Sequence, residues 1–148
     1  MNVASRSKLA APCGLYCGVC IAYLVSKSCH GCGCTCGSCA ASTHHNECEI
    51  YKCCVREANL EACCECEDFP CSLLIRFCND PVWRTHLVVI ENLRRRRKTG
   101  ADGWLEEQEQ TWKNRKDVRR WLWFQKECID RRRESLKESE NISASTKN

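Results

Sequence analysis

The chain has 148 residues, a net charge of +4 and seventeen cysteines, sixteen of which precede residue 79. It contains no stretch near the roughly 20 apolar residues of a membrane span, and its first eleven residues include Arg6 and Lys8 but no apolar segment of an export signal. These features argue against a secreted disulfide framework, so we predict a soluble cytoplasmic protein with reduced thiols and no membrane association.

Short helices separated by loops are predicted for the cysteine-rich half. A helix over residues 15–27 would place Cys17 and Cys20 on one face, because residues three apart are neighbours on a helix. Glycine, serine, threonine, histidine and cysteine dominate residues 28–47, which are therefore predicted to be irregular. Two further short helices are predicted, at residues 53–62 and 71–77.

Longer helices are predicted for the second half. Asp80 is a good N-cap with Pro81 at the first helical position, and Gly100 is predicted to end this first helix. Apolar residues recur along it at helical spacing: Trp83, Leu87, Ile90 and Leu93. Further helices are predicted over residues 104–114 and from Asp117 onward.

The charge also changes between the halves. Up to Cys78 there are six basic and seven acidic residues, whereas the rest of the chain has seventeen and twelve. We therefore divide the chain into a cysteine-rich metal-binding region (1–78), a basic helical region (79–137) and a disordered tail (138–148). The first region has few large apolar side chains, so metal ligation would have to supply stability that its thin core does not. The predicted fold is small, metal-stabilised and mainly α, with irregular cysteine-rich loops and a helical C-terminal half.

The cysteines form an ordered series of motifs. Four pairs have two intervening residues, a spacing at which two thiolates on a tight turn bind one metal ion: Cys17/Cys20, Cys29/Cys32, Cys36/Cys39 and Cys63/Cys66. In chain order the motifs are Cys13-Gly-Leu-Tyr-Cys-Gly-Val-Cys-Ile-Ala-Tyr, Cys29-His-Gly-Cys32, Cys48-Glu-Ile-Tyr-Lys-Cys53, Cys63-Cys-Glu-Cys66 and Glu67-Asp-Phe-Pro-Cys71. Together with Trp104-Leu-Glu-Glu-Gln and Trp112, they resemble the DUF3795 family of small cysteine-rich prokaryotic proteins. The resemblance spans roughly residues 12–112 and implies metal binding, and the family has no assigned biochemical activity.

Two positions depart from the family pattern. His45 stands where family members tend to have a cysteine, and histidine is a common zinc ligand but a less common iron-sulfur ligand. Residues 113–116, Lys-Asn-Arg-Lys, take the place of a further cysteine pair of some relatives, so a terminal metal site is not expected.

The positions that match the family motifs divide into three candidate ligand groups. The first has a spacing close to that of tetrahedral zinc sites and consists of Cys29, Cys32, His45 and Cys48. The second is a four-thiolate set: Cys53, Cys63, Cys66 and Cys71. The third, Cys13, Cys17 and Cys20, needs a partner from Cys34, Cys36 or Cys39. Ligands distant in sequence can be exchanged between sites, so the partition stays open.

Two cofactors compete for these ligands. His45 and the absence of a C-x2-C-x2-C-x3-C-P run favour Zn²⁺, whereas the abundance of thiols and Pro70 beside Cys71 keep a [4Fe-4S] cluster as the alternative. The C-x3-C-x2-C spacing that ends at Cys20 also occurs in radical S-adenosylmethionine enzymes. No repeated βαβ pattern follows it, so that enzyme class is not expected.

The remaining cysteines have simpler interpretations. Cys78 and Cys128 lie among apolar residues at helical positions, where cysteine commonly packs as a small hydrophobic side chain. Cys54 and Cys64 adjoin predicted ligands, and the sequence assigns no role to them.

The basic half offers a possible surface for nucleic acid. Phosphates could be bound by the cations of one run: Arg94, Arg95, Arg96, Arg97 and Lys98. Bases could stack on the tryptophans, Trp104, Trp112, Trp121 and Trp123. Interspersed glutamates favour a salt-bridged, solvated surface instead, and tryptophans at helical spacing usually fill a core.

No constellation of catalytic residues is recognisable. We find no Ser/His/Asp arrangement, phosphate-binding loop or paired carboxylates in an apolar frame. The sequence therefore predicts a non-catalytic, zinc-stabilised scaffold or accessory module that serves an unknown protein partner. The alternatives are an iron-sulfur redox or electron-transfer protein and a nucleic-acid-binding zinc module.

Overall fold

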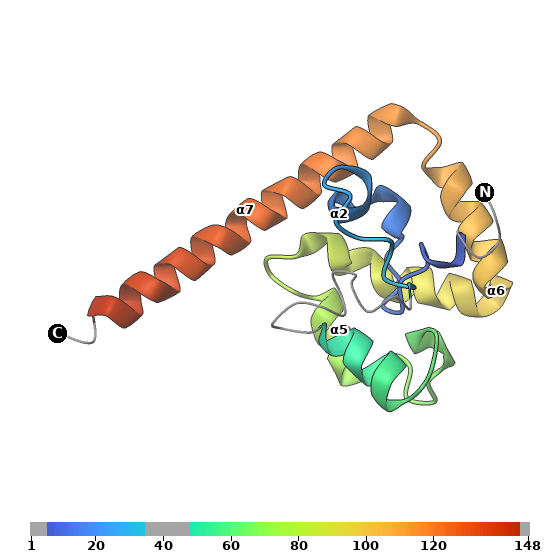
Figure 1. Cartoon of the computed structure of the whole chain (residues 1–148). Coiled ribbons are helices and arrows are strands. Elements are labelled where there is room, and N and C mark those ends of the chain that lie inside the picture. The colour runs from blue at the N-terminus through green and yellow to red at the C-terminus, as the bar shows by residue number, and fades with distance from the viewer. Residues whose placement is uncertain (1–5, 35–47, 146–148) are drawn as a thin grey trace.

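The computed structural model describes residues 6–34 and 48–145, which are mainly helical and contain no strand. Short helices form the cysteine-rich half: η1 (Cys17–Val19), α2 (Ile21–Leu24), α4 (Glu49–Tyr51), the π-helical turn η2 (Lys52–Glu57), η3 (Cys63–Glu65) and α5 (Ser72–Cys78). The second half consists of η4 (Arg84–Val88), α6 (Val89–Thr111) and α7 (Arg115–Ser145). Figure 1 shows a small body from which the C-terminal part of α7 projects.

The predicted helix over residues 15–27 is wrong, because the chain is extended at Cys20 (φ −91°, ψ 137°). Cys20 separates η1 from α2, and its carbonyl accepts hydrogen bonds from the N–H groups of Tyr23 and Leu24. It is therefore the N-cap of α2, and Gly18 and Val19 before it are weak helix formers. The helix predicted over residues 53–62 starts earlier, since α4 and η2 together cover residues 49–57.

The Asp80 prediction also needs correction. Its carboxylate Oδ1 accepts hydrogen bonds from the N–H groups of Val82 and Trp83, both at 2.8 Å, which makes a turn instead of a helix start. Helical structure begins with the 3-10 helix η4, whose three residues per turn shift the apolar spacing. As a result Leu87, predicted to face the core, is 47 % exposed.

Gly100 interrupts α6, as predicted. Its backbone has φ 79° and ψ 167°, outside the helical range, although helix resumes directly after it. The second limb ends at Thr111, so the predicted helix over residues 104–114 starts and ends a few residues earlier.

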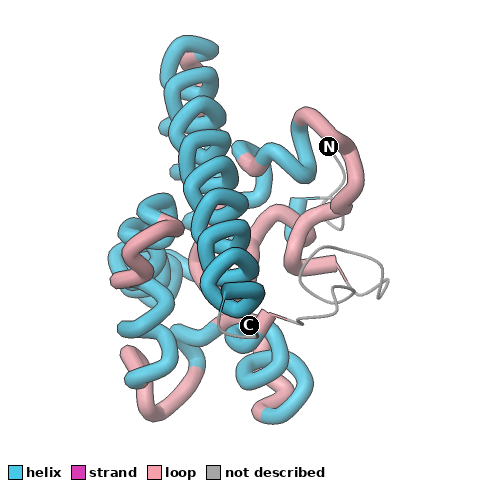
Figure 2. The backbone as a smooth tube through the Cα atoms, turned by 90° about the vertical axis from the view of Figure 1, so that its left-hand side faces the viewer, coloured by secondary structure: helices cyan, strands magenta, loops and turns pink. Residues whose placement is uncertain are grey.

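The predicted disordered tail is helical through Ser145. Glu138 and Glu140 continue a segment of good helix formers, which propensity favours over a coil. Figure 2, which looks at the molecule from the side of the C-terminus, shows α7 in front of the shorter helices. Among the described residues no helix combines the length and the apolarity needed to cross a membrane.

The main core joins both halves of the chain. Trp104 and Leu93 of α6 are fully buried and belong to the same cluster as Leu74 of α5 and Ala11 of the N-terminal segment. Cys78 (8 % exposed) and Cys128 (1 %) are buried, which confirms their predicted packing role. The cysteine-rich half is thus attached to α6 by apolar packing.

Arg96 adds a polar anchor to this core. It is only 6 % exposed, its Nη1 donates a 2.9 Å hydrogen bond to the Ala11 carbonyl, and its guanidinium lies 5.7 Å from the centre of the Trp104 ring. Its neighbour Arg95 instead forms a two-pronged ion pair with Glu107 at the surface, with a shortest distance of 2.7 Å.

Candidate functional site

Five cysteines from the N-terminal loops and the start of α4 gather around a sixth, Cys32. These residues, called the Cys32 group, are Cys13, Cys17, Cys20, Cys29, Cys32 and Cys48. The sulfur of Cys32 is in hydrogen-bonding contact with those of Cys17 and Cys29, and it is close enough to Cys13, Cys20 and Cys48 for their charges to interact. The described cysteines of the first and third predicted ligand groups therefore form a single neighbourhood.

Backbone N–H groups point at two of these sulfurs. The N–H of Cys32 donates to Sγ of Cys17 at 3.2 Å, and the N–H of Gly31 donates to Sγ of Cys29 at 3.3 Å. Both donors belong to the C-x2-C turn of residues 29–32. This turn therefore places backbone N–H groups against the sulfurs of Cys17 and Cys29.

Two glycines allow the 29–34 loop to lie directly on the N-terminal segment. Gly31 has φ +109°, and a Cβ atom there would collide with the Lys8 carbonyl. A Cβ atom on Gly33 would lie 2.7 Å from the Ser7 carbonyl oxygen, and the Gly33 N–H donates to the Lys8 carbonyl at 3.0 Å. This contact sets the position of Cys29 and Cys32 relative to the rest of the group.

Four thiols of the Cys32 group have raised pKa values. Burial raises the pKa of Cys13, Cys20 and Cys48, although backbone N–H groups beside each sulfur offset part of the increase. The pKa of Cys32 is raised mainly by its hydrogen bond with Cys17 and then by burial. Several thiolates at such short range would repel one another, so a bound cation is needed to stabilise them.

A second set of cysteines surrounds a small cavity beneath α5. The cavity has a volume of about 30 Å³, which is about the size of a water molecule. The cysteines that line it, called the cavity group, are Cys53, Cys54, Cys63, Cys66 and Cys71. Four of them make up the second predicted ligand set, and they come from η2, from the two ends of η3 and from the residue before α5.

Short helical turns hold the cavity group in place. The Cys66 N–H donates to the Cys63 carbonyl across η3 at 3.2 Å, and the Cys63 N–H donates to the Pro12 carbonyl at 3.0 Å. The thiols of Cys54 and Cys63 are in hydrogen-bonding contact, which lowers the pKa of Cys54 and raises that of Cys63. Cys54 also donates to the Leu60 carbonyl at 3.7 Å.

Within the described ranges, no group of three or more histidine, cysteine, aspartate or glutamate side chains is arranged to hold a metal ion. In the Cys32 group, the atom that the other five sulfurs have as a common neighbour is the sulfur of Cys32. The donor chemistry nevertheless suits zinc or an iron-sulfur cluster, because both sets offer several soft sulfur ligands. His45, Cys36 and Cys39 lie outside the described residues.

Cys54 was assigned no role from the sequence, yet it lines the cavity beside Cys63. Its position directly after Cys53 was the only available signal, and chain adjacency does not show which of two neighbouring side chains turns inward. Cys34 is buried with Cys29 in a separate small cluster, and its sulfur lies 3.9 Å from Nδ1 of His30.

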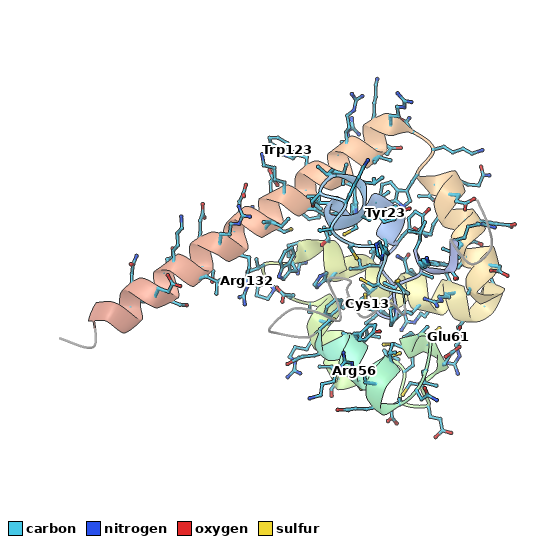
Figure 3. The ribbon with its side chains drawn as sticks, in the orientation of Figure 1. Cys13, Tyr23, Arg56, Glu61, Trp123 and Arg132 are labelled. Carbon is cyan, nitrogen blue, oxygen red and sulfur yellow. The ribbon has the colours of Figure 1, made fainter. Side chains whose placement is uncertain are left out.

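The tryptophans and arginines divide between core and surface. Trp104 is fully buried, and Trp112 and Trp121 pack on each other with ring centres 5.5 Å apart. Trp123 on α7 is 64 % exposed and points away from the body, whereas Cys13 lies inside it (Figure 3). Of these four tryptophans, Trp123 is therefore the one most available for stacking on a base.

The chain matches no family model, no curated protein and no solved structure. The resemblance of its cysteine motifs to the DUF3795 family therefore stays a prediction.

Proposed function

We propose that this protein is a non-catalytic metal-binding module whose cysteine thiolates hold metal ions at the Cys32 group and at the cavity group. One observation carries the proposal: cysteines from η2, η3 and the start of α5 line one cavity of about 30 Å³. The other residues that line the cavity are apolar and offer no ligand, so a metal ion in this space would be held by the cysteines alone.

The ligands follow from the geometry of each group. Cys53, Cys63, Cys66 and Cys71 would hold the ion of the cavity group, with Cys54 as the hydrogen-bonding neighbour of Cys63. In the Cys32 group, N–H groups already face Cys17 and Cys29, which makes these two sulfurs the best supported ligands there. A bound Zn²⁺ would supply no redox chemistry and would act as a cross-link between short helices that share little core.

An iron-sulfur cluster is the alternative occupant, because every described ligand candidate is a cysteine. Elemental analysis of untagged protein purified without oxygen, together with an ultraviolet-visible spectrum, distinguishes the two. We expect about two zinc ions per chain and no visible absorption band. Iron with acid-labile sulfide, together with a visible band that bleaches on reduction, would identify the cofactor as an iron-sulfur cluster. The protein would then have a redox role.

Cysteine variants test the location of the metal. Cys29→Ala and Cys66→Ala should each lower the metal content by about one ion per chain and reduce solubility, because each removes a predicted ligand. Cys128→Ala is the control, since Cys128 is also buried (1 % exposed) but lies on α7 and belongs to neither group. If all three variants keep the metal content of the unmodified protein, neither group binds metal.

We also propose a second candidate function, binding of single-stranded nucleic acid along the basic helices. Arg96 is buried, whereas four cations of the run are exposed: Arg94, Arg95, Arg97 and Lys98. Arg95 is held by Glu107 at 2.7 Å, and Arg94 lies 3.9 Å from Glu91 in a longer pair. Arg94, Arg97 and Lys98 surround a shallow depression with Phe69 and Pro70, which places an aromatic ring beside the phosphate-binding groups. Binding would combine these charges with stacking on rings such as Phe69.

Salt dependence tests this second candidate. The double variant Arg94→Ala/Arg97→Ala should lower the slope of log affinity against log salt by about 1.4 for a single-stranded oligonucleotide, since each lost phosphate contact contributes about 0.7. Arg95→Ala removes one charge of the same run but an already paired one, so its slope should change less. Equal slopes for all three proteins would exclude this surface.

A further inference from the structure

A large pocket lies between the cysteine-rich half and the long helices. Its volume is about 590 Å³, within the range of about 300–1,000 Å³ typical of small-molecule sites. One wall comes from η1 and α2 and includes Cys17, Cys20 and Cys32 of the Cys32 group. The opposite wall comes from η4, α6 and α7, near the point where α7 passes α2 (Figure 1).

The lining of this pocket is chemically unusual for the chain. Lys, Arg, Asp and Glu make up 28 % of the sequence, yet none of them is among the described residues that line the pocket. The lining includes five rings: Tyr16, Trp83, His86, Trp112 and Trp121. A charged ligand would find no counter-ion in such a pocket and would lose hydration without compensation.

Side-chain contacts hold several rings in place before any ligand binds. Nε1 of Trp112 donates to Oε1 of Gln108 at 3.2 Å. The His86 ring stacks on Trp83 with ring centres 5.9 Å apart. Rings fixed in this way give a planar ligand contact area without much further loss of side-chain entropy.

Gln125 fastens α7 across the pocket. Its Oε1 accepts from the Ile21 N–H at 3.1 Å and its Nε2 donates to the Val19 carbonyl at 2.6 Å. Both contacts join α7 to the opposite wall, so the two walls are tied together around the space. The pocket is therefore part of the folded arrangement of the two halves.

Two amide side chains provide polar groups in the lining. Asn92 uses its Nδ2 to donate to the Gly14 carbonyl at 3.0 Å, which leaves Oδ1 as an acceptor. Gln108 uses Oε1 to accept from Trp112, which leaves Nε2 as a donor. A ligand with a carbonyl group on the edge of its rings matches the donor.

We infer that this pocket binds an uncharged, planar, fused-ring compound with a carbonyl on its edge, held between the aromatic residues and the wall of the Cys32 group. The inference goes beyond the proposed function and does not depend on bound metal. Contact with Cys17, Cys20 and Cys32 would make ligand binding and the state of the cysteines influence each other.

A matched pair of fluorescent probes tests the charge and shape of the ligand. 10-Methylacridone is a neutral three-ring carbonyl compound, and acridone-10-acetate has the same rings with a carboxylate. We expect saturable binding of 10-methylacridone, measured by fluorescence anisotropy on the protein as purified, and at least tenfold weaker binding of the acetate. Absence of saturable binding, or equal affinity for the two probes, would overturn the inference.

Two tryptophan substitutions on α7 test the location. Ile129 lines the pocket, whereas Leu136 is 48 % exposed two turns further along the same helix. Ile129→Trp should fill the pocket and weaken 10-methylacridone binding at least tenfold, and Leu136→Trp should leave it unchanged. Equal binding by both variants would place the probe elsewhere and overturn the assignment.

Folding and metal content are measured on the same samples. If Ile129→Trp does not fold, Val88→Phe replaces it, because Val88 enters the pocket from η4. A protein without metal that binds the probe would refute the proposed function but not this inference. A metal-loaded protein that does not bind the probe would refute this inference but not the proposed function.

Discussion

The Cys32 group and the cavity group contain the same C-x2-C turns but differ in what lies between the sulfurs. In the Cys32 group, sulfurs contact one another through Cys32. In the cavity group, Cys54 and Cys63 are in contact, but all five cysteines also line a space of about 30 Å³. The supports differ as well, since a glycine-rich loop positions Cys29 and Cys32, whereas helical turns position the cavity group.

This difference shows that the local spacing of cysteines does not determine whether a set of cysteines is already arranged to bind a metal ion. A pair such as Cys63/Cys66 offers two sulfurs on one turn, and so does Cys29/Cys32. Whether those sulfurs meet other sulfurs or an empty space depends on segments far away in the chain. We therefore expect metal to enter the cavity group with less rearrangement than the Cys32 group.

The largest effect is expected for Gly31→Ala, which disturbs the loop that positions the Cys32 group but not the turns that position the cavity group. A Cβ atom at φ +109° would collide with the Lys8 carbonyl, so the free energy of unfolding should fall by about 3 kcal/mol. Metal content should fall without reaching zero, because the cavity group does not use this loop. Denaturant unfolding and elemental analysis measure both quantities.

Gly100→Ala is the control for Gly31→Ala. Gly100 also has a positive φ (+79°), but no atom lies within 4 Å of the position of its Cβ. Its backbone (φ 79°, ψ 167°) is one that almost only glycine adopts, so Gly100→Ala should cost about 1–3 kcal/mol from strain alone and leave the metal content unchanged. Complete loss of metal in Gly31→Ala would show instead that the two groups bind as a single unit.

An intermediate effect is expected for Arg96→Met, which tests what joins the two groups. Arg96 binds the Ala11 carbonyl near Cys13, and its charge also acts on Cys54 and Cys64. The substitution removes a buried hydrogen bond from a charged donor and leaves the Ala11 carbonyl with the Gly14 N–H only, so the free energy of unfolding should fall by about 2 kcal/mol. Denaturant unfolding is the measurement.

The neighbouring Arg95→Met is the control for Arg96→Met. Arg95 forms an exposed ion pair with Glu107, and such pairs contribute little to stability, so Arg95→Met should lower the free energy of unfolding much less than Arg96→Met. Comparable losses of stability in the two variants would mean that Arg96 is no special link between the cysteine groups.

The smallest effect tests the support of the cavity group through α5. The His86 ring stacks on Phe77 of α5 with ring centres 3.9 Å apart, and burial lowers the pKa of His86 despite the opposing effect of Asp80. Below pH ~6.5 the unfolded chain takes up a proton that the folded protein resists. Stability should therefore fall as the pH drops, by at most ~1.4 kcal/mol per pH unit.

His86→Phe removes this titration while it keeps an aromatic ring against Phe77. Unfolding measured between pH 5 and pH 7 should show a shallower pH dependence for the variant than for the unmodified protein. Parallel curves would show that His86 ionises equally well in the folded and unfolded states.

Local features of the fold were predictable where interactions between residues close in the sequence determine the structure. Gly100 breaks the helix because its backbone adopts a positive φ, and Cys78 and Cys128 are buried because they lie among apolar residues. Failures occurred where a tertiary contact overrode the local pattern. Cys20 was predicted inside a helix, but it caps one and its sulfur faces the Cys32 group.

The sequence predicted which cysteines belong to the candidate site, but it predicted only partly which of them lie together. Spacing and family resemblance identified Cys53, Cys63, Cys66 and Cys71 as one set, and these residues line one cavity. Spacing separated Cys29 and Cys32 from Cys17, which the structure brings into contact. No sequence pattern pointed to the aromatic pocket, because its lining comes from many segments that each contribute one to a few residues.

The sequence by itself determined that this is a small, mainly helical, cysteine-rich chain, because composition, helix periodicity and glycine positions act over a few residues. Only the tertiary structure decided which sulfurs meet, which arginines are buried and where an uncharged pocket remains. Those outcomes depend on contacts between residues far apart in the chain, such as Arg96 with Ala11 and Gln125 with Ile21. Packing and burial set such contacts, and neither is a property of any short segment.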